Sequence, residues 1–182
     1  MEKKIGVILF NLGGPDKLSA VKPFLFNLFN DPAIIGAPSF IRYFLARLIS
    51  SKREKTAKEI YSFIGGKSPI LEETEKQKKQ LEELLKIEKE DYKVFVSMRY
   101  WKPFINETTT KVINWQPDEV ILLPLYPQFS TTTSGSSLHS WKKEIDTNKF
   151  RVPTKIICCY PTEENFIKAH VNEIKKIIKK AE

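Results

Sequence analysis

The sequence predicts an α/β fold in which a four-stranded parallel sheet is flanked by helices. The chain contains four short runs that are almost continuously apolar, as is typical of strands buried on both faces of a parallel sheet. Helical patterns lie between the runs, and this alternation is typical of repeated strand–helix–strand units. The predicted strands are Lys4–Leu12, Tyr92–Met98, Glu119–Tyr126 and Thr154–Tyr160.

The helices between these strands are predicted from apolar residues that recur every three or four positions. Ala20–Asn30 has an apolar face, and Glu72–Glu88 is strongly charged with leucines on one side. Glu54–Ile64 leads into two glycines, which typically end a helix. The other predicted helices are Phe40–Ser50, Pro103–Trp115, Ser137–Asp146 and Glu163–Lys180.

The composition is that of an ordinary globular protein. The 182 residues are 41% hydrophobic and 29% charged, which excludes wholesale disorder, collagen-like structure and a coiled coil. No run approaches the roughly 20 apolar residues of a membrane span, and the first residues do not indicate export. The two cysteines, Cys158 and Cys159, are adjacent. Adjacent cysteines disfavour a disulfide framework or a spaced metal site, and they fit a reducing cytosol.

The net charge of +8 comes mainly from lysine. Proteins that read nucleic-acid sequence rely on arginine, because its planar guanidinium forms paired hydrogen bonds with bases and phosphates. The lysine excess therefore favours a solvated surface, anionic lipid or an acidic small molecule over nucleic acid. The only arginines are Arg42, Arg47, Arg53, Arg99 and Arg151.

Ligands of parallel sheets bind beyond the carboxyl ends of the strands, so the loops after the strands are candidate binding segments. Asn11–Pro15 contains two glycines, which either form a plain turn or allow the backbone to approach a ligand. Arg99 follows the second strand and is a candidate anion-binding residue. The segment 130–137 carries seven hydroxyl side chains that either line a polar pocket or face solvent.

The loop between two predicted helices, Ile64–Ile70, is a further candidate. Ser68 is predicted to cap the following helix, whose first amides would attract an anion. Arg53, Tyr61 and Ser68 are separated by eight and seven residues, which would place them near one edge of a regular helix.

Several functional classes are disfavoured by the residues present. A serine nucleophile needs a base, but His139 and His170 lie on predicted helices and no Gly-x-Ser-x-Gly elbow occurs. The first loop lacks the glycine fingerprint of dinucleotide-binding proteins and the ending of a P-loop. No set of His, Cys and carboxylates has the spacing of a complete metal site.

Four segments are distinctive when taken together: Asn11–Pro15, Tyr61 with Ile64–Ile70, Met98–Tyr100, and Leu123–Leu138. They resemble, in the same order, motifs of the ferrochelatases, which insert ferrous iron into protoporphyrin in haem synthesis. The resemblance runs from Lys4 to about His170, and its last segment is long and specific.

The resemblance implies a chelatase-like enzyme of two Rossmann-like lobes with the porphyrin between them. Residues 1–182 would form the N-terminal lobe, and the second lobe would lie outside this chain. A porphyrin is a large apolar disc with two carboxylates, so it needs an apolar entrance and Arg, Ser and Tyr donors.

The resemblance also implies which residues bind substrate. The implied residues are Leu12 at the porphyrin face; Phe24, Leu25, Leu28 and Phe29 in an apolar lip that admits the porphyrin and can touch a membrane; Arg53, Tyr61 and Ser68 as porphyrin-binding residues; Arg99 and Tyr100 on the wall beside the metal; and Ser130 and Ser137 on the pocket loop.

This sequence departs from the family in its catalytic residues. The Ser-Ala-His-Gly/Ser-Leu-Pro motif of the catalytic histidine and the later metal-site carboxylate do not occur, because both would belong to the second lobe. No catalytic or metal-binding residue is therefore assigned, and the chain alone is expected to be inactive or nearly so. Thr131 stands where members with an iron–sulfur cluster have Cys, so no cluster and no permanently bound cofactor are expected.

The sequence thus predicts part of a ferrochelatase that acts on protoporphyrin IX or coproporphyrin III, with Fe(2+) as a substrate. The expected location is cytoplasmic, with peripheral contact at the inner membrane left open and no nucleic-acid partner. The alternative is a stand-alone porphyrin-binding module without metal insertion.

Overall fold

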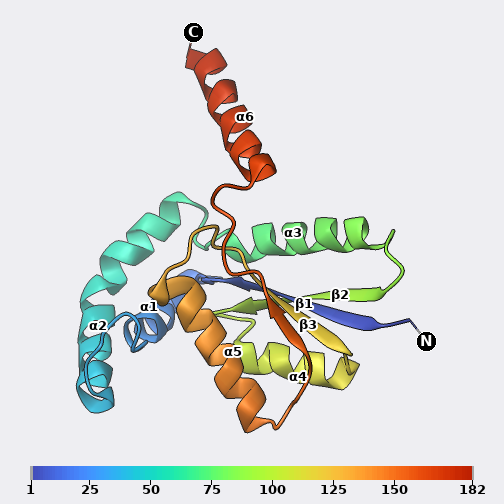
Figure 1. Cartoon of the computed structure of the whole chain (residues 1–182). Helices are drawn as coiled ribbons and strands as arrows, with labels where there is room; N and C mark the ends of the chain where they lie inside the picture. Colours follow the sequence, from blue (N-terminus) through green and yellow to red (C-terminus); the bar gives the residue numbers. More distant parts are fainter. Residues whose placement is uncertain (1, 182) are drawn as a thin grey trace.

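The computed structural model describes residues 2–181 as a parallel sheet with helices on both faces (Figure 1). The strands β1 (Lys4–Asn11), β2 (Asp91–Met98), β3 (Glu119–Pro124) and β4 (Thr154–Ile156) lie in the order β2-β1-β3-β4, and every neighbouring pair is parallel. The predicted fold class is therefore confirmed. The helices are η1 (Leu18–Ala20), α1 (Val21–Phe29), α2 (Ser39–Phe63), α3 (Ile70–Leu85), α4 (Ile105–Trp115), the π-helical turn η2 (Thr131–Gly135), α5 (Ser136–Thr147) and α6 (Glu164–Ala181).

The central strand β1 is apolar from Ile5 to Phe10 because both of its faces are covered. Val7 and Leu9 point to the face where Leu81 and Leu85 of α3 pack. Ile8 and Phe10 point to the opposite face, which is covered by side chains of α4 and α5 such as Val112 and Trp141. Successive residues of a strand alternate between faces, so only a continuous apolar run can fill both cores.

A third apolar cluster lies beyond the carboxyl ends of the strands. Val21, Phe24 and Leu25 of α1 pack there against Tyr100, which follows β2. Helices α1 and α2 lie side by side at this end of the sheet (Figure 1). The cluster therefore joins the helical layer to the loops that were predicted to bind a ligand.

Helix α2 differs from the sequence prediction. Two helices, Phe40–Ser50 and Glu54–Ile64, were expected, but the chain forms one helix of 25 residues. The polar stretch between the predicted helices contains no Gly or Pro, and its Lys and Arg residues are good helix formers. Solvent exposure explains the polarity of this stretch without a break in the helix.

The fourth strand also differs. A strand buried on both faces was expected over Thr154–Tyr160, but only Thr154–Ile156 pairs with β3, and these residues are exposed. As the edge strand, β4 has a neighbour on one side only. Cys158 and Cys159 follow it as exposed free thiols.

Helix α6 extends away from the sheet (Figure 1). One side of it carries exposed Ile167, Val171 and Ile174, and several lysines lie among them. Within the described part of the chain, no helix combines the length and the apolar character that crossing a membrane requires.

Candidate functional site

The loop Asn11–Pro15 is joined to the loop after β2 by backbone hydrogen bonds. Arg99 N donates to Asn11 O at 2.9 Å, and Tyr100 N donates to Leu12 O at 2.9 Å. Gly13 has a φ of 81°, and a Cβ there would lie 3.0 Å from Trp101 N. Packing against this chain's own backbone therefore explains Gly13, which favours the plain-turn interpretation of this glycine.

The residues of the predicted lip are only partly at the surface. Phe24 and Leu25 are buried in the cluster with Tyr100, so they are not exposed in this structure, and their assignment to the lip stays a prediction. They face inward because α1 needs an apolar side to pack on the end of the sheet. Leu12, Leu28 and Phe29 are only partly buried against the same cluster and remain accessible.

The exposed apolar surface lies instead on the first half of α2. The side chains of Phe40 and Phe44 are 66% and 68% exposed. Ile41, Tyr43 and Leu48 are exposed beside them, and we call these five residues the α2 apolar patch. An exposed patch of this kind indicates an interaction surface.

Arg53 and Tyr61 of α2 both contact the cluster. The guanidinium carbon of Arg53 lies 5.8 Å from the centroid of the Phe29 ring, while the Arg53 side chain stays exposed. Tyr61 packs against the cluster, and burial raises the pKa of its phenol, which keeps it a neutral donor. Arg53 and Tyr61 thus both lie at this cluster, where they supply a cation and a hydroxyl.

Ser68 lies beside Pro15, at the end of the loop that follows β1. Its backbone N–H donates to Pro15 O at 2.8 Å, and its hydroxyl oxygen accepts from Ile70 N at 3.3 Å. Ser68 thus satisfies an amide at the start of α3, as expected, although the helix begins at Ile70. The side chain also lies directly against Gly14.

Arg99 and Tyr100 converge on one buried carboxylate, that of Asp31. Arg99 Nη2 lies 2.7 Å from Asp31 Oδ2, and the Tyr100 hydroxyl donates to the same oxygen at 2.8 Å. The Ser136 hydroxyl also donates to Oδ2 at 2.6 Å and accepts from Arg99 Nε at 2.7 Å. We call Asp31, Arg99, Tyr100 and Ser136 the Asp31 network.

Charge and burial oppose each other at Asp31. Burial by itself would raise the pKa of the Asp31 carboxyl. Hydrogen bonds from Ser136 and the backbone of Ala33, together with the Arg99 charge and the Tyr100 hydroxyl, outweigh burial and hold that pKa below its usual value. Burial and the neighbouring carboxylate raise the pKa of Tyr100. At neutral pH the network therefore contains a carboxylate, a guanidinium and a neutral phenol.

The hydroxyl-rich loop supplies a second group of polar atoms. Ser130 Oγ lies 2.9 Å from Thr132 Oγ1 and accepts from Thr132 N, which caps η2. Ser137 is buried near Tyr126, and within residues 2–181 neither hydroxyl makes a hydrogen bond of good geometry. Burial raises the pKa of Tyr126 to about 12, against the opposing effects of Ser137 and Arg99. Buried hydroxyls without partners are costly for folding alone, so they are candidate ligand contacts.

Sequence reasoning found Arg99 and Tyr100 but missed Asp31 and the role of Ser136. The partners of Asp31 are 69 and 105 residues away in the chain, so no local pattern joins them. One signal was present, because Asp31 is the only charged residue between Lys22 and Arg42. A lone carboxylate in an apolar stretch needs a partner if it is buried.

The histidines do not join the site. Both His139 and His170 are exposed on helices, and His170 Nδ1 lies 2.9 Å from the Phe166 carbonyl. Among residues 2–181, no three His, Cys, Asp or Glu side chains are grouped so that they could hold a metal ion.

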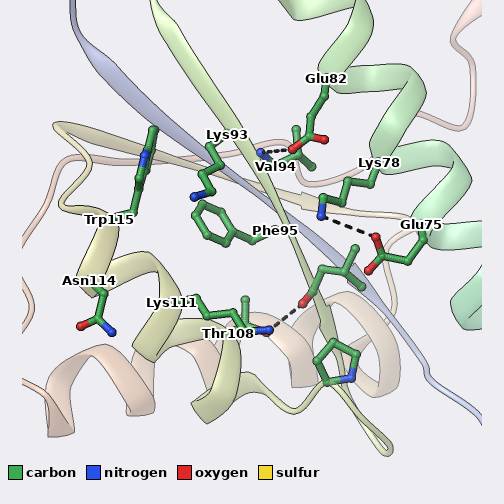
Figure 2. Close-up of a pocket in the computed structure, with 12 residues that line it drawn as sticks. Glu75, Lys78, Glu82, Lys93, Val94, Phe95, Thr108, Lys111, Asn114 and Trp115 are labelled. Carbon is green, nitrogen blue, oxygen red and sulfur yellow. Dashed lines mark hydrogen bonds and ion pairs between the residues drawn. The ribbon is translucent and has the colours of Figure 1, made fainter.

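A groove of about 460 Å³ runs along the outer edge of β2, between α3 and α4 (Figure 2). Figure 2 shows that Lys78, Lys93 and Trp115 line it, and none of the predicted site residues does. Within it Val94 N donates to the Glu82 carboxylate at 3.1 Å. The groove is thus an edge of the sheet whose backbone is satisfied by neighbouring side chains, and it is separate from the candidate site.

The site as a whole combines an apolar surface with anion-binding and neutral donors. Leu12, Leu28 and Phe29 are partly exposed at the carboxyl end of the sheet, with Arg53 over Phe29. The Arg99 side chain, which belongs to the Asp31 network, is partly exposed. This arrangement can hold one face of a flat apolar molecule and meet its acidic groups at the rim.

Comparison with known proteins identifies the family of this chain. The family model described as Ferrochelatase matches residues 4–182. The ferrochelatase of Rickettsia bellii (strain OSU 85-389) is 57% identical over 178 residues, which are 97% of this chain and 49% of that protein. The ferrochelatase of Caulobacter vibrioides is 55% identical over 183 residues, covering 100% of this chain and 52% of that protein.

The ferrochelatase of Pelagibacter ubique is 53% identical over 178 residues, which cover 97% of this chain and 52% of that protein. This chain therefore spans about half the length of the curated relatives it matches. The family match covers almost every residue of the chain, including all four carboxyl-end loops. The chain belongs to the ferrochelatase family.

Proposed function

We propose that this chain is the half of a ferrochelatase that binds one face of a porphyrin, in an enzyme that inserts Fe(2+) into protoporphyrin IX or coproporphyrin III during haem synthesis. The observation that carries the proposal is the joint placement of an apolar surface, Arg53 and the Asp31 network at one end of the sheet. The family match and the names of the relatives support it.

The chemistry of a porphyrin fits these side chains. Its macrocycle is apolar and would lie against Leu12, Leu28 and Phe29. Its two propionates would accept hydrogen bonds from Arg53 and from hydroxyl groups such as those of Tyr61 and Ser68. These assignments follow the donors that the structure leaves partly or fully exposed.

The chain alone is proposed to be inactive or nearly so. Metal insertion requires a base that takes protons from the pyrrole nitrogens and a wall that distorts the macrocycle. In the enzyme, the second lobe would supply that base, a metal-site carboxylate and the opposite wall.

Equilibrium titration tests the binding part of the proposal. Protoporphyrin IX is added to the purified chain, and the shift of its Soret absorption is followed. We expect micromolar binding that R53A and Y61F weaken. The matched control is R151A, since Arg151 is an exposed arginine that pairs with Asp146 outside the site. A titration without any Soret shift, or equal weakening by R151A, contradicts the proposal.

An assay of metal insertion distinguishes part of a ferrochelatase from a stand-alone porphyrin-binding module. A part of a ferrochelatase should insert zinc or iron only once a second lobe completes the cleft. The alternative, a stand-alone porphyrin-binding module, should bind porphyrin and stay inactive when a second lobe is added. Insertion by the 182-residue chain alone, at the rate of a full-length enzyme, contradicts the proposed inactivity.

The α2 apolar patch supports a peripheral membrane contact. Its exposed aromatic side chains lie on the helix that also carries Arg53, so a porphyrin could reach the site from lipid. Exposed Arg47 and Lys52 lie on the same helix and would favour an anionic surface. We therefore propose that the protein works in the cytoplasm at the inner face of the membrane.

A further inference from the structure

We propose that Asp31 is the positioning residue of this site, which holds Arg99 and Tyr100 in one geometry and balances the Arg99 charge without touching substrate. This inference concerns how the wall of the site is built, and its consequence for ligand binding rests on the proposed porphyrin function. Asp31 lies between α1 and α2 and is 4% exposed.

The geometry leaves Asp31 little capacity for any other task. Its Oδ2 atom accepts from Arg99 Nη2, the Tyr100 hydroxyl and the Ser136 hydroxyl, at 2.7, 2.8 and 2.6 Å. Its Oδ1 atom accepts from Ala33 N at 2.8 Å. A carboxylate with both oxygens engaged and its side chain buried is poorly placed to take a proton from a ligand.

The network also joins three segments that are far apart in sequence. Asp31 belongs to the α1–α2 connection, Arg99 and Tyr100 follow β2, and Ser136 begins α5. Because Ser136 both donates to Asp31 and accepts from Arg99 Nε, the guanidinium is held at two of its nitrogens. A planar guanidinium held in this way cannot swing toward solvent as a surface arginine does.

The contacts with Asp31 and Ser136 determine which part of the Arg99 side chain a ligand can reach and how much of its charge is balanced. The Arg99 side chain is 23% exposed, so one part of it reaches the site while its charge is balanced by Asp31. Arg53, in contrast, is exposed and lies over an aromatic ring. We assign the attraction of substrate carboxylates to Arg53, and the rigid wall of the pocket to Arg99 as held by Asp31.

A direct test observes the Arg99 side chain by NMR in the wild-type chain. The Arg99 Nε–H proton should exchange slowly with water and give a separate signal, whereas those of Arg53 and Arg151 should exchange quickly. This measurement needs neither porphyrin nor a variant. Exchange at Arg99 as fast as at Arg53 overturns the proposal.

Variants then test the role of the charge. D31N keeps the shape of the side chain and removes its charge, and it should speed exchange at Arg99 Nε–H and shift the Tyr100 ring signals. S136A should speed exchange at Arg99 and is the substitute if D31N does not fold. The matched control is E54Q, because Glu54 is a partly exposed carboxylate that pairs with Lys22 and Lys58 outside the network.

Porphyrin titration supplies the functional readout. In a folded D31N chain, binding of protoporphyrin IX should weaken by about tenfold or more, since a misplaced wall is costly for ligand contacts. E54Q should bind like the wild type. Unchanged binding by folded D31N, with a released Arg99 signal, overturns the functional part of the proposal. If the wild-type chain does not bind porphyrin, the proposed function fails while the NMR result still decides the positioning role.

Discussion

Gly14 lies against Ser68 so closely that a Cβ atom at position 14 would overlap the Ser68 side chain. The same atom would lie 3.3 Å from Ile70 Cγ2, so the start of α3 also limits the space. This contact explains why a glycine precedes Pro15, and it links the loop after β1 to the loop before α3. The link positions Ser68 beside the candidate site.

G14A should therefore destabilise the chain by about 1–3 kcal/mol, because overpacking forces the Ser68 loop to move. Urea unfolding followed by circular dichroism measures this change. G36A is the control, since no atom lies within 4 Å of a Cβ built there. The double variant G14A/S68G should recover part of the loss. If G14A is as stable as the wild type, the Ser68 loop moves aside without a cost in stability, and the prediction is wrong.

Two adjacent serines should respond in opposite ways to removal of their hydroxyl groups. S136A deletes a donor to Asp31 and an acceptor for Arg99, so it should lower the free energy of unfolding by about 1–3 kcal/mol. S137A removes a buried hydroxyl that has no partner within residues 2–181, so it should leave stability unchanged or raise it by about 1 kcal/mol.

The variants S136A and S137A also distinguish an effect on stability from an effect on porphyrin binding. S137A should weaken protoporphyrin binding in a Soret titration while it does not lower the unfolding midpoint, as is expected where function retains an unsatisfied group. Equal stability losses in S136A and S137A would show that the two hydroxyls have similar surroundings in the folded chain.

The stabilising effect of Asp31 should depend on pH. Its pKa in the folded chain lies below the value of about 3.9 in the unfolded chain, so its contribution is present above that value and is lost as pH falls through the folded pKa. At pH 7 we expect D31N to be less stable by about 2–4 kcal/mol, less than for a fully buried pair because Arg99 is partly exposed.

Urea unfolding of wild type and D31N at pH 7 and at pH 3 measures this dependence. The difference between the two chains should shrink at the lower pH, because the Asp31 carboxyl of the unfolded wild-type chain is then largely protonated and tends to lose its proton on folding. A difference that stays constant between the two pH values would mean that the Asp31 charge does not contribute. The variant E54Q provides the baseline for a partly exposed carboxylate.

The α2 apolar patch should bind lipid. The double variant F40S/F44S should weaken binding to vesicles of phosphatidylglycerol and phosphatidylcholine by about tenfold or more, because two aromatic side chains lose their apolar contact. The control L84S/I87S removes two apolar side chains at and just after the end of α3 that are at least as exposed as Phe40 and Phe44. Vesicle co-sedimentation measures both, and the same loss in both variants argues against a specific patch.

Much of the fold could be predicted because it follows from local patterns. β1 and most of β2 are rich in apolar residues, and the helices between strands show their periodicity in sequence. The errors arose where local pattern and packing disagree. The polar middle of α2 suggested a break, and the residues after Ile156 have an apolar pattern although no neighbouring strand covers them.

The candidate site was predicted in the same partial way. Arg99 could be predicted because a charged residue at the carboxyl end of a parallel strand is placed where ligands bind. Phe24 and Leu25 were assigned to the lip from the family resemblance, since periodicity identifies an apolar face but not what that face contacts. The exposed apolar side chains proved to lie on α2.

The sequence by itself determined the parallel α/β fold, the loops that carry the site and the family resemblance, since these depend on residues that are neighbours in the chain. Only the tertiary structure decided that Asp31 joins Arg99, Tyr100 and Ser136, and which apolar side chains remain exposed. The physical reason is that burial and ion pairing depend on distances between segments that are up to 105 residues apart. Those distances are set by the packing of the sheet and its helices.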